Sequence, residues 1–293
     1  MRSVHTLMHG IVDYAGLFPP AGLDLATAVA NYAAYRAGSS CWALGRFVVP
    51  AARLGEFERA AEPYLPTEGQ PWRLAALGGA DLASDLAAIH QFNDRRGHAA
   101  VVDTIELKAG TRAEIRAALA AIDGRLDAYV ELPITSDPGE LVAELVGAGA
   151  RAKVRTGGIT PEAFPNADDL FRFILRCTDA GVPFKATAGL HHPLRGSYRL
   201  TYAPESPCGT MYGFLNVFLT AAAVSHAVPD SIARALLEES SADALRFDEE
   251  GVSYRGARID DAQIRHTRRY HAIAFGSCSF TEPIDDLRAL GLL

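Results

Sequence analysis

Short apolar runs alternate along the chain with longer segments whose apolar residues recur every three to four positions. Runs of the first kind are typical of buried strands, and segments of the second kind are typical of helices that cover them. The two alternate at a spacing of roughly 25–35 residues, which indicates a parallel β/α fold. Asp24 and Thr111 are predicted N-caps of two of the helices. The seven predicted strands lie within 8–20, 41–50, 72–79, 99–110, 127–135, 150–158 and 182–189.

The pattern changes after the seventh strand. A polar segment rich in proline and glycine at 193–210 is predicted to be a loop, which could act as a lid that excludes water. Helical periodicity follows at 212–228 and 231–239, and 244–247 is the predicted eighth strand, continued by a β-hairpin. A last helix is expected at 260–270.

These elements predict an α/β fold in a single domain, a (β/α)8 or TIM barrel with a C-terminal helical extension. No linker divides the chain, and 293 residues lie within the usual size of such a barrel. The segment 260–293 is expected to pack on the barrel. An open, doubly wound parallel sheet is the alternative, because both folds are built from the same strand–helix units.

The charge of the chain limits its partners. Its formal net charge is -7, its pI is near 5.7, and its basic residues are scattered. A nucleic-acid or membrane surface is therefore not expected, whereas a small anionic metabolite could bind in a local basic pocket. The four cysteines are far apart without a C-x-x-C pair, which favours reduced thiols and a cytoplasmic location. The longest apolar run, 214–224, is too short to span a bilayer.

Charged residues interrupt several predicted strands near their carboxyl ends. In a parallel barrel the reacting groups lie at these ends, and alternate residues of a strand face the interior. The fourth strand offers two inward sets, Asp103 with Ile105, or Thr104 with Glu106 and Lys108. We expect the second set, because it gives this strand a polar end that faces the next strand. The same alternation pairs Tyr129 with Glu131, Lys153 with Arg155, and Lys185 with Thr187.

Four charged side chains are thereby expected around the mouth of the barrel. Packing gives a hydrophobic strand no reason to carry a lysine, and burying an unpaired charge is costly. Lysines and carboxylates that share a site compensate one another and shift each other's pKa. The alternative is that these side chains extend outward into solvent. The four candidates for catalysis are Glu106, Glu131, Lys153 and Lys185.

The sixth and seventh predicted strands resemble a known family. Ala-Lys-Val-Arg-Thr-Gly-Gly at 152–158 and Pro-Phe-Lys-Ala-Thr-Ala-Gly at 183–189 are similar to the two lysine strands of deoxyribose-phosphate aldolase and related class I aldolases. The resemblance implies that Lys153 forms an imine with a carbonyl substrate and that Lys185 is its electrostatic partner. Such an enzyme would be a carbon–carbon lyase. A carboxylate from the fourth or fifth strand would then move protons.

A substrate anion has candidate ligands next to the lysines. Thr156, Gly157 and Gly158 precede a predicted helix start and could present main-chain N–H groups to a carboxylate or phosphate. Glycines at this position also serve any tight turn between a strand and a helix. Arg155 is adjacent and would add a positive charge. The other residues predicted to contact substrate are Thr187, His191, His192 and Asp13.

The adjacent histidines leave a second chemistry open. Neighbouring residues of a strand point to opposite faces, so in a strand only one could ligate a metal, whereas a loop would allow both. Barrel lyases of the hydroxymethylglutaryl-CoA-lyase type carry a His-X-His at this strand, a spacing that the pair lacks. No cofactor is the first expectation, and a divalent ion in a metal-dependent lyase or isomerase is the alternative. The residues considered as its ligands are His191, Glu106, Glu131, Asp13 and His9.

Cys278 lies in Phe-Gly-Ser-Cys-Ser-Phe near the end of the chain. No periodicity places a histidine next to this cysteine, so a buried, inert thiol is expected instead of a nucleophile. The sequence thus favours an aldolase-like lyase that acts on a small anionic carbonyl metabolite. A silent barrel that binds a metabolite or forms a homo-oligomer is the third alternative, although such a barrel would gain little from buried charge.

Overall fold

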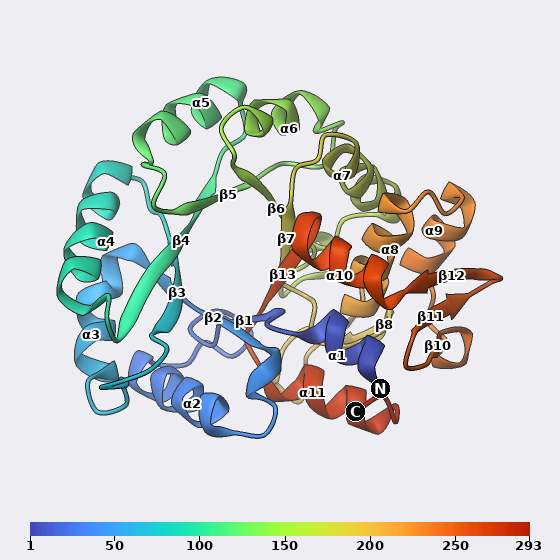
Figure 1. Ribbon diagram of the computed structural model, residues 1–293, viewed down its shortest axis with the longest axis horizontal. Coiled ribbons are helices and arrows are strands. Elements are labelled where there is room, and N and C mark those ends of the chain that lie inside the picture. Colours follow the sequence, from blue (N-terminus) through green and yellow to red (C-terminus); the bar gives the residue numbers. More distant parts are fainter.

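The alternating segments fold into a closed barrel of eight parallel strands, with helices around the outside (Figure 1). The structure is a computed structural model that describes residues 1–293. The barrel strands are β1 (Val12–Tyr14), β2 (Leu44–Pro50), β3 (Trp72–Leu77), β4 (Ala100–Lys108), β5 (Asp127–Glu131), β6 (Arg151–Arg155), β7 (Phe184–Thr187) and β13 (Ala272–Ser277). Their order is β1-β13-β7-β6-β5-β4-β3-β2, which leaves no edge open. The predicted TIM barrel is confirmed, and the open, doubly wound sheet is wrong.

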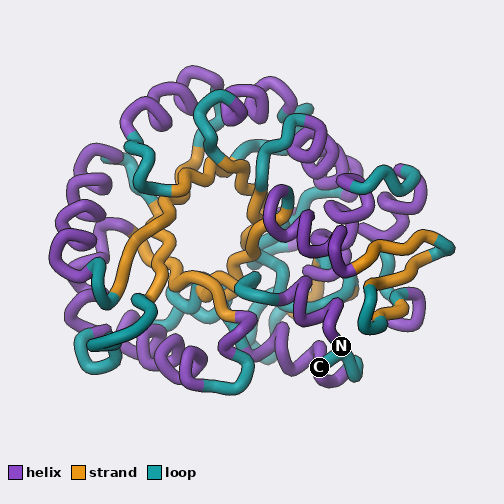
Figure 2. The backbone as a smooth tube through the Cα atoms, in the orientation of Figure 1, coloured by secondary structure: helices purple, strands orange, loops and turns teal.

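A helix follows each barrel strand, and together these helices form the outer ring around the strands in Figure 2. Polar caps fix where several of them begin. Asp24 accepts the N–H of Thr27 at 2.9 Å, and Thr111 forms a capping box with Glu114, so both predicted N-caps are confirmed. The eight helices are α2 (Leu25–Ala37), α3 (Leu54–Ala61), α4 (Leu82–Arg96), α5 (Arg112–Ala121), α6 (Gly139–Val146), α7 (Ala167–Asp179), α8 (Phe214–Ser225) and α11 (Thr281–Ala289).

The eighth barrel strand is not the predicted one. Residues 246–247 form β10 (Arg246–Phe247), which joins β11 (Gly251–Tyr254) and β12 (Ala257–Asp260) in a small antiparallel sheet beside the barrel (Figure 2). The barrel is closed by β13, which pairs with β1 and β7. The segment 260–293 therefore completes the barrel and does not merely pack on it. The local sequence pattern cannot distinguish a barrel strand from a strand of the small sheet, because the two differ in the strands with which they pair.

Three further helices lie outside the strand–helix repeat. They are α1 (Arg2–Met8), which was not predicted, α9 (Asp230–Leu237) and α10 (Asp261–Tyr270), which confirms the last predicted helix. Arg268 of α10 ties it to α1, because its guanidinium donates to the carbonyl oxygen of Leu7 at 2.7 Å. Most of the buried apolar side chains form one continuous cluster that extends from Val4 to Leu287. None of the helices is long and apolar enough to cross a membrane.

The segment 193–210 contains more regular structure than predicted. It includes two antiparallel strands, β8 (Gly196–Arg199) and β9 (Cys208–Met211). The hydroxyl of Tyr198 donates to the carbonyl oxygen of Leu194 at 3.0 Å and anchors the first strand to the preceding turn. The polar composition of this segment therefore reflects a partly exposed hairpin that follows β7 in the chain.

A bulge in β4 changes the expected alternation. Consecutive residues of β3 pair with residues of β4 that are two apart, so Asp103 is the extra residue between them. Thr104 and Glu106 are buried as predicted, whereas Lys108 is exposed at the end of the strand. Asp103 nevertheless reaches the buried Arg46, whose Nε donates to it at 2.6 Å. The bulge thus lets Asp103 and Glu106, which belong to different alternation sets of this strand, both make polar contacts with buried residues. Strict alternation would allow only one of the two sets to do so.

Candidate functional site at the carboxyl ends of the strands

The four charged residues predicted for catalysis meet inside the barrel. In-register pairing places Lys153 of β6 between Glu131 of β5 and Lys185 of β7. The Nζ atom of Lys153 lies 2.9 Å from Oε2 of Glu106 and 3.0 Å from Oε2 of Glu131. The Nζ atom of Lys185 lies 2.6 Å from the other carboxylate oxygen of Glu106. Glu106 therefore bridges the two lysines, and the outward-extending alternative is wrong for all four side chains.

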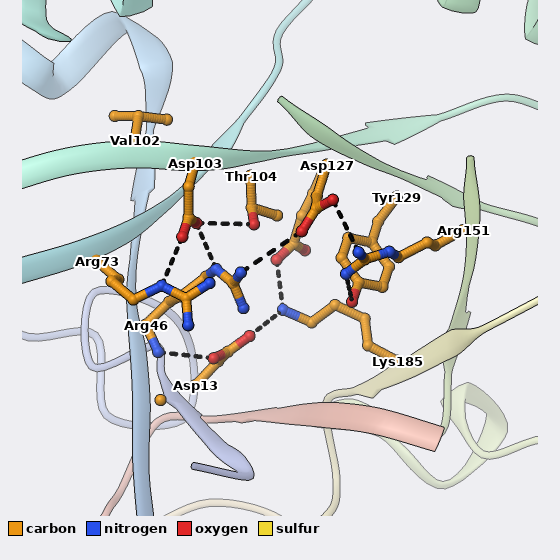
Figure 3. A network of polar contacts seen from close by, with 12 residues as sticks. Asp13, Arg46, Arg73, Val102, Asp103, Thr104, Asp127, Tyr129, Arg151 and Lys185 are labelled. Carbon is orange, nitrogen blue, oxygen red and sulfur yellow. Dashed lines mark hydrogen bonds and ion pairs between the residues drawn. The ribbon is translucent and has the colours of Figure 1, made fainter. Parts of the chain in front are cut away.

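Lys185 is the more enclosed of the two lysines. Its Nζ atom lies 2.5 Å from Oδ2 of Asp13 as well as near Glu106, and 5.6 Å from the ring centre of Tyr129 (Figure 3). Burial alone would lower the pKa of Lys185, but these two carboxylates outweigh burial and raise it. Lys185 is thus held as an ammonium ion. Asp13, which was predicted to contact substrate, is buried and holds this lysine instead.

The ammonium groups have a matching effect on the carboxylates. Burial alone would raise the pKa of Glu106, but Lys153 and Lys185 outweigh it and lower the pKa to about 2. Burial also opposes ionisation of Glu131, and Lys153 followed by Arg155 lowers the pKa of this carboxyl below its usual value. Glu131 has only one lysine beside it, whereas Glu106 has two. Of the two carboxylates, Glu131 is therefore the easier one to protonate.

A cavity of about 250 Å³ opens above the two lysines at the carboxyl ends of the strands. The side chain of Lys153 is 9% exposed and that of Lys185 is 1% exposed, so Lys153 is the lysine that a ligand can reach. One wall of the cavity is apolar and includes Phe18 and Pro19 of the loop after β1. Its polar lining residues are Glu106, Lys153, Arg155, Lys185, Thr187, His191 and Cys278.

The predicted substrate contacts divide into two groups. Arg155, Gly158, Thr187 and His191 line the cavity, as a ligand-binding role requires. Arg155 is exposed, and its Nε lies 3.5 Å from Oε1 of a carboxylate on β5. His192 lies in an adjoining recess.

Thr156 and Gly157 have structural roles. Thr156 is buried, its N–H donates to the carbonyl of Thr187 at 2.9 Å, and its hydroxyl donates to the carbonyl of Ala188 at 2.6 Å. Ala188 has a φ of 64°, a left-handed conformation that costs a non-glycine residue about 1 kcal/mol. Thr156 thus fixes a strained turn at the end of β7. A Cβ atom at Gly157 would collide with the ring of Phe164, so close packing explains this glycine.

The paired histidines contact α11 and form no metal cluster. Nδ1 of His191 lies 3.1 Å from Oε2 of Glu282, and Nδ1 of His192 lies 2.7 Å from Oδ2 of Asp286. No three His, Cys, Asp or Glu side chains converge in an arrangement that could hold a metal ion. His9 lines a separate surface hollow with arginines of α10. The ligand set considered for a divalent ion is therefore not assembled.

The structure brings Cys278 next to a histidine, contrary to the sequence prediction. The Sγ atom lies 4.0 Å from Nδ1 of His191 and 3.6 Å from the hydroxyl oxygen of Tyr202. These residues come from the end of β13, the turn after β7 and the segment 193–210. Because they are far apart in the sequence, no spacing rule could have placed them together.

A second charged network continues from Asp13 through the interior of the barrel (Figure 3). Asp13 accepts the main-chain N–H of Arg46 at 2.7 Å, and the guanidinium of Arg46 bonds Asp103 and lies 3.7 Å from Asp127. Arg151 donates to Asp127 at 2.8 Å. Sequence reasoning did not select Arg46, Asp127 or Arg151. The available signal was the same as for the lysines, a charged residue within a predicted buried strand.

Lysine usage is a further signal that sequence reasoning did not use. The chain has 28 lysines and arginines, and only Lys108, Lys153 and Lys185 are lysines. Almost every other basic position of the chain is an arginine. Two buried lysines on neighbouring strands therefore indicate a position that requires a primary amine. A primary amine can act as a nucleophile, and a guanidinium, which stays charged, cannot.

Comparison with known proteins adds no relative to this description. No protein-family model matches the chain, and a search of curated proteins finds no similar sequence. The chain therefore belongs to the TIM-barrel fold on structural grounds, and its chemistry has to be argued from the site itself.

Proposed function

We propose that the protein is a carbon–carbon lyase that binds a small anionic carbonyl compound as an imine of Lys153. The observation that carries the proposal is the reachable Lys153 amine at the base of the cavity, next to a second lysine that is locked as a cation. A protonated imine withdraws electrons from the neighbouring carbon–carbon bond, which is the requirement for cleaving it.

The two lysines have different roles in this proposal. Lys185 is held by two carboxylates at 2.5 and 2.6 Å and cannot give up its proton easily. Its fixed charge lies one strand away from Lys153, on the strand that pairs with β6. Lys153 is held less closely, at 2.9 and 3.0 Å, and it is the more exposed amine. Lys153 is accordingly the nucleophile, and Lys185 is its electrostatic partner.

Glu131 is the proposed proton acceptor. The amine of Lys153 must lose a proton before it attacks, and Glu131 is the adjacent carboxylate that contacts one lysine, whereas Glu106 contacts two. When a ligand displaces water from the cavity, a neutral amine and carboxylic acid become favourable relative to a buried ion pair. Glu131 gives this proton to the hydroxyl of the carbinolamine, which leaves as water when the imine forms. The carboxylate then removes the proton of the substrate hydroxyl as the carbon–carbon bond breaks. Glu106 stays ionised between the lysines and positions them.

Arg155 links substrate binding to this proton transfer. Its side chain is 55% exposed, lines the cavity and lies 3.5 Å from Glu131. A carboxylate or phosphate of the substrate would form a stronger, bidentate contact with the guanidinium. Drawing Arg155 away from Glu131 removes a positive charge from this carboxylate, which raises its proton affinity. Binding of an anionic substrate would therefore make Glu131 a stronger base for the proposed reaction.

Borohydride trapping tests the proposal. The protein is incubated with short aldehydes and 2-keto acids, including acetaldehyde and pyruvate, reduced with sodium borohydride, digested and mapped by mass spectrometry. Because the chain contains three lysines, every adduct can be assigned. We expect the adduct on Lys153, with the exposed Lys108 as an internal control for unspecific alkylation.

Two variants complete the test. Lys153→Met should abolish the adduct, and Lys185→Met should reduce its rate of formation while leaving the residue that is modified unchanged. Labelling that is confined to Lys108, or full lyase activity in Lys153→Ala, would show that no imine is involved.

A further inference from the structure

The cavity contains a second nucleophilic side chain that the proposed lyase reaction does not use. Cys278 follows β13, lines the same cavity as Lys153, and is 6% exposed. The other three thiols lie elsewhere: Cys177 is fully buried in α7, and Cys41 and Cys208 are on the surface. Among the thiols, Cys278 alone shares a ligand-sized space with a carbonyl-binding residue.

Two polar groups lie next to this thiol, and a carboxylate holds both of them. Nδ1 of His191 lies 4.0 Å and the hydroxyl oxygen of Tyr202 lies 3.6 Å from Sγ of Cys278. Glu282 bonds both of them, since its Oε2 lies 3.1 Å from Nδ1 of His191 and accepts the Tyr202 hydroxyl at 2.8 Å. The carboxylate thus fixes the orientation of both groups around the sulfur atom.

The charges in this cluster favour an imidazolium next to the sulfur. Burial alone would lower the pKa of His191, but its contacts with Cys278 and Glu282 raise the pKa to about 9. An adjacent imidazolium stabilises a thiolate, which is the nucleophilic form of cysteine. Cys177 is the opposite case, because it has no polar partner and burial raises the pKa of its thiol. Cys278 therefore differs from Cys177 in having polar partners next to its sulfur atom.

We propose that Cys278 and His191 form a second covalent site in the cavity, which takes aldehydes as hemithioacetals. The site uses neither the amine of Lys153 nor an imine, so it does not depend on the proposed lyase reaction. An aldehyde that enters the cavity would meet both the amine of Lys153 and the thiol of Cys278, because both residues line it.

The reaction is a balanced addition. The sulfur of the Cys278 thiolate forms a bond to the carbonyl carbon, and the π electron pair moves to the carbonyl oxygen. His191 gives its proton to this oxygen and becomes neutral. Thiol and aldehyde combine without an oxidant or a reductant, and the reverse steps release the aldehyde. Because the bond is reversible, the site would hold an aldehyde for a time and release it unchanged.

The first test measures the reactivity of each thiol. Timed labelling with iodoacetamide, followed by peptide mass spectrometry, gives separate rates for the four cysteines. We expect Cys278 to react faster than Cys177, and to keep its rate at lower pH than the exposed Cys41 and Cys208. In His191→Gln the rate at Cys278 should fall roughly tenfold. Equal rates and equal pH profiles for Cys278 and the surface cysteines in the wild-type protein would overturn the proposal, whether or not the variant folds.

The second test asks whether the thiol binds aldehydes. Glyceraldehyde should slow the labelling of Cys278 but not of the surface cysteines, and glycerol at the same concentration should not. The protection should persist in Lys153→Met, where no imine can form. Protection that is lost in Lys153→Met would assign the aldehyde to the imine alone and refute the thiol site. Protection of Cys278 without any borohydride adduct on Lys153 would refute the lyase proposal and leave the thiol site standing.

Discussion

Glu106 is the residue whose removal tests the charge network most directly. It is 4% exposed, and each of its carboxylate oxygens contacts a different lysine, at 2.9 and 2.6 Å. Glu106→Gln keeps the size and shape of the side chain but removes the negative charge between two ammonium groups. The remaining carboxylates, Asp13 and Glu131, then have to balance the two lysines alone.

The cost follows from the shifted pKa of the carboxyl. Its value falls from 4.5 to about 2, and this difference corresponds to about 3 kcal/mol in favour of the ionised form in the folded protein. Removing one partner of a buried ion pair typically costs about 3–5 kcal/mol. We therefore expect Glu106→Gln to lower the free energy of unfolding at pH 7 by about 3–5 kcal/mol. Since the pKa is depressed, this contribution is present above pH 4.5 and is lost as the pH falls towards 2.

Urea unfolding followed by far-ultraviolet circular dichroism measures both effects. At pH 7 the variant should show a lower midpoint with an unchanged m value. Between pH 4.5 and 2 the wild type should lose stability more steeply than the variant. Glu56→Gln is the matched control, because this half-exposed glutamate is ion-paired with Arg53 on the surface, and its removal should change little. Equal losses in the two variants at pH 7 would refute the interpretation of Glu106 as a buried bridge.

Three further predictions concern the surrounding structure. Arg46→Met should lower the free energy of unfolding by about 3 kcal/mol, because Asp103 loses its buried partner; chemical denaturation measures this, and an unchanged midpoint would contradict it. The pKa of His191 is raised to about 9, so its contact with Glu282 stabilises the fold below pH 6.5 and less as the pH rises through 9; His191→Gln should reduce the melting temperature at pH 6 more than at pH 9.5. Gly213→Ala should lower the free energy of unfolding by about 1–3 kcal/mol, because a Cβ atom there would collide with the backbone of the turn after β7. A melting temperature equal to that of the wild type would contradict this close approach.

The placement of the two lysines was within reach of sequence reasoning. Lys153 and Lys185 each lie in a short apolar run, and alternation along parallel strands puts both on the interior face at the same end of the sheet. The same reasoning selected Glu106 and Glu131, which the structure brings within 3.0 Å of Lys153. The success has a simple cause, because neighbouring strands in the chain are also neighbours in the barrel.

The sequence predictions fail where contacts join segments that are not neighbours along the chain. The eighth strand is β13, and its partner β1 is separated from it by almost the whole chain. The bulge at Asp103 depends on how β3 and β4 fit together and leaves no mark in the alternation of residues. Thr156 was predicted to present its main-chain N–H to an anion, but this N–H donates to the carbonyl of Thr187 at 2.9 Å.

The sequence by itself therefore determined the fold class, the seven consecutive strand–helix units and the four charged residues at the mouth of the barrel. These features follow from local periodicity and from the rule that consecutive parallel strands lie side by side. Only the tertiary structure decided that Lys185 is locked by Asp13 while Lys153 faces the cavity, and that Cys278 meets His191 there. Closure of the barrel is the physical reason, because it brings together side chains that are more than 80 residues apart in the chain.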